Sequence, residues 1–159
     1  VPLCYHGALE SDYDYKMGLM VKFVQKHITT TSENPTLTED NLAEYYMSKS
    51  GSPKKKTFYL LKEEVEPEIR TKNSFAGAYP YNFVYSTREE IAKLIENNDE
   101  SGIILHLIGP QMNSTLSYCV KIIIDTKEGN IFYYEMDKMT EKNPDLLLKS
   151  DLKKLANKE

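Results

Sequence analysis

The stretch from Thr57 to Asp137 limits the fold most, because short apolar runs alternate there with a helix start and close in a hairpin. Runs of β-branched, aromatic and aliphatic residues bounded by Gly, Pro, Asn or Ser are typical of β-strands. Five runs have this composition: 57–61, 81–85, 103–108, 118–124 and 131–136. The stretch predicts strands and helices in one sheet, but it specifies no activity.

A capped helix is predicted between the second and third of these runs. Ser86 and Thr87 stand three residues before Glu89 and Glu90. This spacing allows a capping box, in which each side chain accepts a hydrogen bond from the other residue's backbone amide. The run 103–108 after this helix is apolar on both faces apart from one histidine, which is typical of a central strand covered on both sides.

Two helices are predicted before the first strand. The first covers about 13–29 and carries an apolar stripe that we expect to pack on the domain. The members of the stripe are Leu19, Met20, Phe23, Val24 and Ile28. We expect the hydroxyl-rich stretch 29–32 and Pro35 to end this helix, and Thr38 to be the N-cap of the second one.

Proline and glycine mark the other expected boundaries. Pro67 suits the first position of a short helix, and Pro144 is expected to open a leucine-rich C-terminal helix. Gly109-Pro110 is expected to end the third strand, and Gly129 suits the turn of a hairpin between the fourth and fifth strands.

This order favours an α/β fold: a mixed sheet with a parallel βαβαβ core, extended by an antiparallel hairpin, with N-terminal helices and a C-terminal helix. An α+β arrangement of a helix and a meander sheet is the alternative. At 159 residues the chain is long enough for one domain with a sizeable core. We expect a single domain over 1–159, in which the helical segment 1–52 packs on an α/β core formed by 53–159.

Charge and hydropathy exclude two classes of partner. The net charge of −4 provides no field to attract nucleic acid. The longest apolar run, 103–108, is far too short to span a bilayer, so we expect a soluble protein without membrane insertion. The chain has 12 tyrosines and no tryptophan, and tyrosine-rich surfaces suit protein recognition.

The two cysteines leave two interpretations open. Cys4 and Cys119 could form one disulfide in an oxidising compartment. Cys119 lies inside a predicted strand, however, and a lone cysteine there usually behaves as a small buried hydrophobe, which is the interpretation we favour. The sequence has no Cys-x-x-Cys pair or Cys/His cluster, so we expect no metal site.

No motif for a cofactor or a nucleophile occurs in the sequence, so we expect no cofactor and assign no catalytic residue. His106 lies near the end of the most apolar strand, and Ser86 and Thr87 lie at a strand end and a helix N-terminus. Ligands of open α/β sheets bind beyond the carboxyl ends of strands, and helix N-termini favour anions. Ser86, Thr87 and His106 are therefore candidate ligand-binding residues. Helix capping alone fully explains Ser86 and Thr87, and a satisfied histidine at the edge of the core is the interpretation we favour for His106.

Four segments together resemble small exported proteins of Bacteroidetes-type bacteria that have no established activity. They are Tyr79-Pro80-Tyr81, the helix start at 86–91, the strand end at 105–110 and the leucine-rich stretch 143–152, so the resemblance covers about residues 55–157. It implies a cleaved signal peptide and a periplasmic or extracellular location. It carries over no catalytic residue.

These observations favour an exported, non-catalytic interaction or binding protein whose partner is a protein or an envelope component. The first residue is Val1, which a removed export signal or a cloned fragment would each explain. A small-ligand binder that uses the strand ends near Ser86 and His106 is the first alternative. An enzyme with a dispersed carboxylate site is the second, because Asp and Glu are too numerous for the sequence to nominate a pair.

Overall fold

The computed structural model describes residues 13–113, 116–140 and 145–158. Within these residues five strands form one mixed sheet in the order β2-β1-β3-β4-β5. β1 is parallel to both β2 and β3, whereas β4 is antiparallel to both β3 and β5. The strands are β1 (Thr57–Leu60), β2 (Phe83–Tyr85), β3 (Gly102–Asn113), β4 (Leu116–Asp125) and β5 (Ile131–Lys138).

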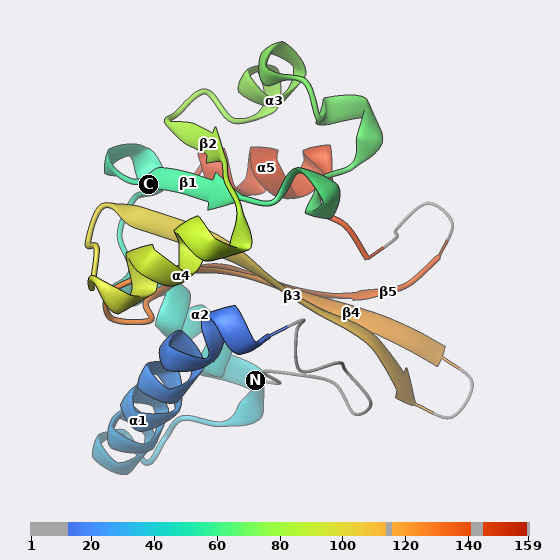
Figure 1. Cartoon of the computed structure of the whole chain (residues 1–159). Helices are drawn as coiled ribbons and strands as arrows, with labels where there is room; N and C mark the ends of the chain where they lie inside the picture. The colour runs from blue at the N-terminus through green and yellow to red at the C-terminus, as the bar shows by residue number, and fades with distance from the viewer. Residues whose placement is uncertain (1–12, 114–115, 141–144, 159) are drawn as a thin grey trace.

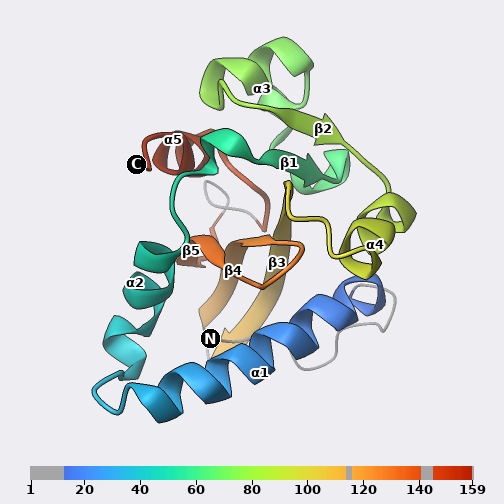
Figure 2. The same cartoon turned by 90° about the vertical axis from the view of Figure 1, so that its left-hand side faces the viewer.

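Helices cover both faces of this sheet (Figure 1). They are α1 (Met17–Glu33), α2 (Glu39–Lys49), α3 (Lys72–Ala78), α4 (Arg88–Glu96) and α5 (Lys149–Ala156). α3 and α5 pack on one face, and α1, α2 and α4 pack on the other. Figure 2 shows the sheet edge-on between these two layers. The predicted α/β fold, with a mixed sheet, N-terminal helices and a C-terminal helix, is confirmed.

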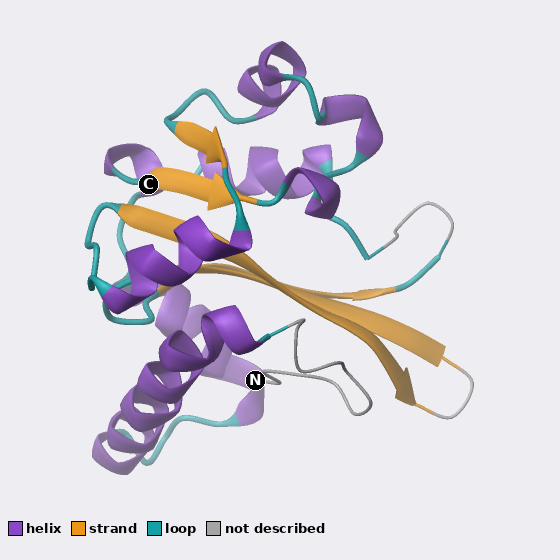
Figure 3. Ribbon diagram, viewed as in Figure 1, coloured by secondary structure: helices purple, strands orange, loops and turns teal. Residues whose placement is uncertain are grey.

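The alternation of side chains along β3 separates the two cores. Ile103 and Leu105 face α3 and α5, whereas Ile104 and Ile108 face α1, α2 and α4. All four side chains are buried, as a run that is apolar on both faces predicts for a strand at the centre of a sheet. β3, β4 and β5 continue past the ends of β1 and β2 (Figure 3).

The expected end of the first helix is wrong, because α1 continues through the hydroxyl-rich stretch to Glu33. Thr29, Thr31 and Ser32 each donate a hydrogen bond from the side chain to the carbonyl four residues earlier. These bonds satisfy the hydroxyls inside the helix, so the residues do not compete with it for backbone groups. The apolar stripe is also only partly correct: Leu19, Met20 and Phe23 are buried, but Val24 and Ile28 are exposed.

The third strand does not end at Gly109-Pro110. β3 continues to Asn113, and its register with β4 shifts between Ile108 and Gln111. Such an irregularity accommodates a proline, because the ladder there does not need the amide donor that proline lacks.

The short helix expected at Pro67 is present as a single turn of 3₁₀ helix, Pro67–Ile69, with Pro67 at its first position. α3, which the sequence did not predict, follows it, and the Thr71 side chain accepts a hydrogen bond from the Ser74 amide at its start. The last helix begins at Lys149 rather than at Pro144, which lies outside the described residues.

Cys119 is buried and carries a free thiol, whereas Cys4 lies outside the described residues. Burial raises the pKa of the Cys119 thiol, which favours the interpretation of this residue as an inert core side chain. In the part of the chain that the structure describes, no helix has the length and apolar character needed to cross a bilayer.

Candidate functional site

The carboxyl ends of the parallel strands form the candidate site. The connection after β1 leads to α3 on one face of the sheet, and the connection after β2 leads to α4 on the other face. A crevice between neighbouring strands whose connections leave on opposite faces is the usual ligand site of an open α/β sheet.

A pocket of about 250 Å³ lies at this edge. β1 pairs with β3 only as far as Ile104. Among the described residues, the part of β3 after Ile104 is therefore hydrogen-bonded only to β4. This part of β3 helps to line the pocket. The lining residues come from five segments: Tyr13, Tyr15, Lys16, Glu63, Glu64, Arg88, Leu107, Gly109, Asp145 and Leu146.

Lys16 and Glu64 form an ion pair in the wall of this pocket. The Lys16 side chain is only 2% exposed, and its Nζ lies 3.5 Å from Glu64 Oε1. Burial lowers the pKa of the Lys16 ammonium, and it raises the pKa of the Glu64 carboxyl. The attraction between the two charges opposes both shifts. Water screens the charges of this buried pair only weakly. A charged ligand in the pocket would therefore interact strongly with them.

Arg88 provides the second cation. It is the first residue of α4, where the capping box of Thr87 and Glu90 fixes the start of the helix. Its guanidinium carbon lies 5.6 Å from the centre of the Tyr15 ring. Arg88 also acts electrostatically on both Lys16 and Glu64, which places its charge at the same end of the pocket.

Asp145 provides the anionic end. Its Oδ1 atom is buried and forms no hydrogen bond within the described structure. Burial raises the pKa of this carboxyl, whereas Lys121 lowers it. Both carboxylate oxygens pack against Gly109, because a Cβ atom built there would lie 3.2 Å from each of them and 3.2 Å from the Cys119 Cβ. A side chain at position 109 would therefore force Asp145 or Cys119 to move by a few tenths of an ångström.

Two backbone hydrogen bonds hold Asp145 and Leu146 beside Glu64. The Leu147 amide donates to the Glu64 carbonyl at 2.8 Å, and the Glu66 amide donates to the Leu147 carbonyl at 3.0 Å. Val65 and Leu147 thus form an isolated parallel bridge, and both side chains are fully buried. The bridge joins segments about 80 positions apart, which no local sequence pattern predicts.

Two of the sequence-predicted residues cap α4. Ser86 Oγ donates to Glu90 Oε2 at 2.7 Å, and the Thr87 amide donates to the same oxygen at 3.0 Å. The Glu90 amide donates in turn to Thr87 Oγ1 at 3.2 Å. The predicted capping box is therefore confirmed. Ligand binding by Ser86 and Thr87 stays a prediction, although Arg88, the next residue, lines the pocket.

His106 is buried in β3, and the Tyr13 ring packs edge-on against it with 5.5 Å between the ring centres. Tyr13 lines the pocket, whereas His106 is not part of the lining. A ligand would reach Tyr13 before His106, so contact between His106 and a ligand stays a prediction.

Sequence reasoning pointed to the strand ends beside which this pocket lies, but it missed the residues that line the pocket. Lys16 and Glu64 lie in 3₁₀ turns, Asp14–Lys16 and Lys62–Glu64, and they meet only in the folded chain. Asp145 falls in a stretch that the sequence assigned to a helix. The one available indication was the position of Arg88, directly after a predicted strand end and helix cap.

A second buried polar cluster lies under α5 and is structural. Lys121 of β4 is fully buried, and its Nζ lies 2.9 Å from Asp151 Oδ2 and 3.4 Å from Asp137 Oδ2. Asp151 also accepts hydrogen bonds from the Tyr133 hydroxyl and the Leu148 amide, both at 2.9 Å. Asp151 is thus surrounded by donors, as a buried charge requires.

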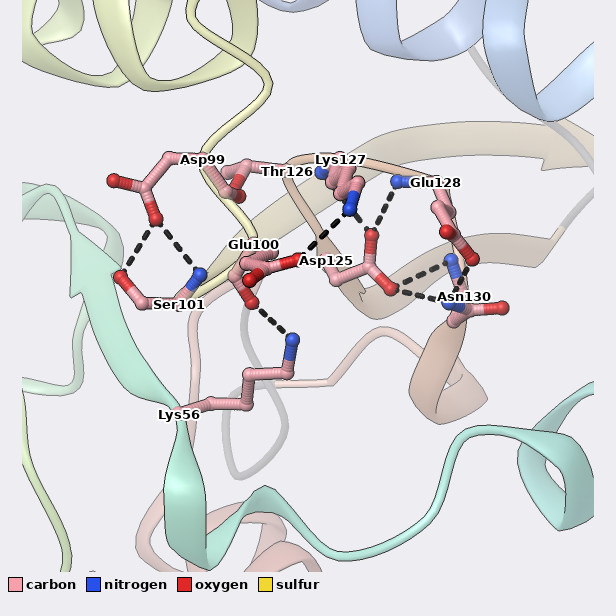
Figure 4. A network of polar contacts seen from close by, with 9 residues as sticks. All are labelled: Lys56, Asp99, Glu100, Ser101, Asp125, Thr126, Lys127, Glu128 and Asn130. Carbon is pink, nitrogen blue, oxygen red and sulfur yellow. Dashed lines mark hydrogen bonds and ion pairs between the residues drawn. The ribbon is translucent and has the colours of Figure 1, made fainter.

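A third network organises the opposite edge of the sheet (Figure 4). The Asp125 carboxylate accepts hydrogen bonds from the backbone amides of residues 127–130, which shapes the turn between β4 and β5. Gly129 in this turn has φ of +71°, a conformation that favours glycine. Thr126 donates to the Asp99 carbonyl, which joins the turn to the loop before β3. Turn geometry explains this network completely.

Within the ranges that the structure describes, no group of three or more His, Cys, Asp or Glu side chains is placed to hold a metal ion. Comparison of the chain with protein-family models, curated proteins and solved structures finds no match. The argument for function therefore rests on the pocket itself.

Proposed function

We propose that this protein is a binding protein for a small polar ligand, which it holds in the pocket beyond the carboxyl ends of β1 and β2, beside β3. One observation carries the proposal: a pocket at this edge contains a buried ion pair and a buried carboxylate oxygen, Asp145 Oδ1, that lacks a hydrogen-bond donor within the described structure. A buried acceptor without a donor is costly, so a donor from a ligand would stabilise it.

The charges favour a ligand that has both signs. Lys16 and Arg88 lie at the end that contains Glu64, whereas Lys121 is the cation that acts on Asp145. A ligand carboxylate would bind between the two pocket cations, and an ammonium group would donate to Asp145. Free α-amino acids and short peptides have this chemistry, and a pocket of about 250 Å³ is slightly below the usual size for drug-sized ligands.

The test is a thermal-shift and NMR titration with three classes of probe: a zwitterionic amino acid or dipeptide, the matched carboxylic acid and the matched amine. We expect the zwitterions to stabilise the protein most. A ligand present at 100 times its dissociation constant adds about 2.7 kcal/mol to the free energy of unfolding.

Two variants that remove one charge each test which end of the pocket binds which charge of the ligand. Asp145→Asn should weaken zwitterion binding at least about tenfold, the loss of one charged contact, while it leaves the carboxylic acid unaffected. Arg88→Gln should weaken both ligands. Lys93→Gln on the exposed face of α4 and Asp40→Asn on α2 are the matched controls. If no probe of any class binds, or if the variants bind as the wild type does, the proposal is wrong.

An enzyme is the second candidate, because two carboxyl groups with raised pKa, Glu64 and Asp145, line the same pocket. Carboxyl groups of this kind serve as general acids at neutral pH. Turnover of a bound ligand that Asp145→Asn abolishes, without a matching loss of affinity, would favour this candidate over simple binding.

The location is part of the proposal. The resemblance to exported bacterial proteins supports a periplasmic or extracellular protein, and it supports a protein or envelope component as a further partner. The negative net charge supports the expectation that the partner is not a nucleic acid. Fractionation of cells that express the full-length gene product tests the location.

A further inference from the structure

The outer face of α1 has an apolar stripe that the fold leaves uncovered. Of the large hydrophobic side chains that are exposed in the described structure, four lie on this helix: Met17, Val21, Val24 and Ile28. Their spacing of four, three and four places them within about 60° of arc, at 100° per residue. Figure 2 shows α1 along the outside of the molecule.

The face around the stripe is uncharged. The exposed positions of α1 are Met17, Gly18, Val21, Val24, Gln25, Ile28, Thr29, Ser32 and Glu33, of which only the last is charged. The two lysines of the helix point toward the body of the protein: Lys22 donates to Asn98 Oδ1 and Lys26 donates to Asn130 Oδ1. A solvated helix face normally carries charges, so this face is suited to contact with another apolar surface.

We propose that the stripe is the seam of a homodimer, in which α1 packs antiparallel against α1 of a second copy. The stripe is symmetric about its midpoint, because Met17 and Ile28 are as far from the centre on one side as on the other, and so are Val21 and Val24. A twofold axis through the centre therefore pairs Met17 with Ile28 of the partner and Val21 with Val24 of the partner.

This pairing is that of an antiparallel coiled coil. The spacing is the heptad a/d pattern, with β-branched side chains at both a positions, and the two smaller valines at the centre allow the helices to approach closely. An uncharged face also meets its own copy without like-charge repulsion. Self-complementarity of this kind is what an isologous interface requires.

The dimer is weak and reversible. A stable interface buries about 800 Å² on each partner, and one helix stripe of about three turns provides less. We therefore expect a dissociation constant between about 10 μM and 1 mM. Sedimentation velocity over this range should show the average mass of the wild-type protein rise from one chain toward two.

Val24→Lys should keep the protein monomeric over the whole range. Val84→Lys is the matched control, because Val84 is 44% exposed in β2 and Val24 is 41% exposed in α1. A thermal melt of each variant checks that the fold is intact. The proposal would be overturned by a wild-type protein that remains monomeric at about 1 mM, whether or not its α1 stripe binds lipid vesicles. A dimer that Val24→Lys does not weaken would overturn it as well.

A mixing experiment tests the antiparallel orientation. Val21→Glu and Val24→Lys should each be monomeric alone, but an equal mixture of the two should dimerise. In the mixed dimer one of the two central side-chain pairs joins the introduced glutamate to the introduced lysine, and the other pair still consists of two valines. A parallel seam would place the introduced glutamate opposite Val21 and the introduced lysine opposite Val24, so no recovery in the mixture would exclude the antiparallel pairing.

Discussion

Replacement of Asp151 by alanine should destabilise the protein strongly, because it leaves a buried ammonium without its nearest counter-charge. Lys121 is fully buried, and Asp151 Oδ2 lies 2.9 Å from its Nζ. Breaking a buried pair in this way costs about 3–5 kcal/mol. The loss of the hydrogen bond from the Leu148 amide at the start of α5 adds about 1 kcal/mol.

Asp137 reduces this cost, since its carboxylate remains 3.4 Å from Lys121 and is partly exposed. We therefore expect a loss of about 4 kcal/mol, compared with a total stability of about 5–15 kcal/mol for a typical domain. Lys121→Met should cost less, about 1–3 kcal/mol, because Asp151 keeps the Tyr133 hydroxyl and the Leu148 amide as donors.

Urea denaturation of the two single variants and the double variant provides the decisive comparison. Lys121→Met/Asp151→Ala contains no orphaned charge, so it should be more stable than Asp151→Ala alone. A double variant that is less stable than both single variants, with unchanged m-values, would refute the reasoning that the loss of the nearest counter-charge of Lys121 dominates the cost.

Three further predictions concern the fold. Ser86→Ala/Thr87→Ala should lower the stability by about 1–2 kcal/mol through loss of the α4 cap, and an unchanged urea midpoint would contradict this. Leu105→Asp should abolish the cooperative melt, because it places an unpaired charge in the buried centre of β3; a melt near that of the wild type would show the position to be wrong. Burial lowers the pKa of Lys158 to about 8, so the unfolded chain binds this proton up to about pH 10.4 and the folded chain releases it earlier. Stability should therefore rise between about pH 8 and 10 relative to Lys158→Met, and parallel pH profiles of the two proteins would exclude the shift.

Local sequence patterns predicted those helices, strands and turns that are determined by residues within one short segment. The N-cap at Thr38 and the capping box at Thr87 marked the starts of α2 and α4. The run of β3 that is apolar on both faces indicated that this strand lies in the centre of the sheet. Gly129 indicated the hairpin between β4 and β5. In each case one short segment contains the residues that decide the structure.

The errors have tertiary causes. α1 passes through 29–32 because packing of Leu19, Met20 and Phe23 and hydrogen bonds within the helix outweigh weak propensities. The pocket could not be predicted because the Lys16–Glu64 pair joins residues 48 positions apart, with no pattern in either segment. Only the edge of the sheet could be predicted, from the rule for strand ends in α/β folds.

The central claim is that the pocket at the strand ends binds a small ligand of both charges. A two-dimensional ¹H–¹⁵N NMR titration of the wild-type protein with a zwitterionic amino acid or dipeptide tests it most directly. The account expects saturable shifts at residues 13–16, 63–66, 88 and 107–109 and at 145–147, with those at 145–147 reduced in Asp145→Asn. Saturable shifts confined to another surface, or no shifts at millimolar ligand, would contradict the claim.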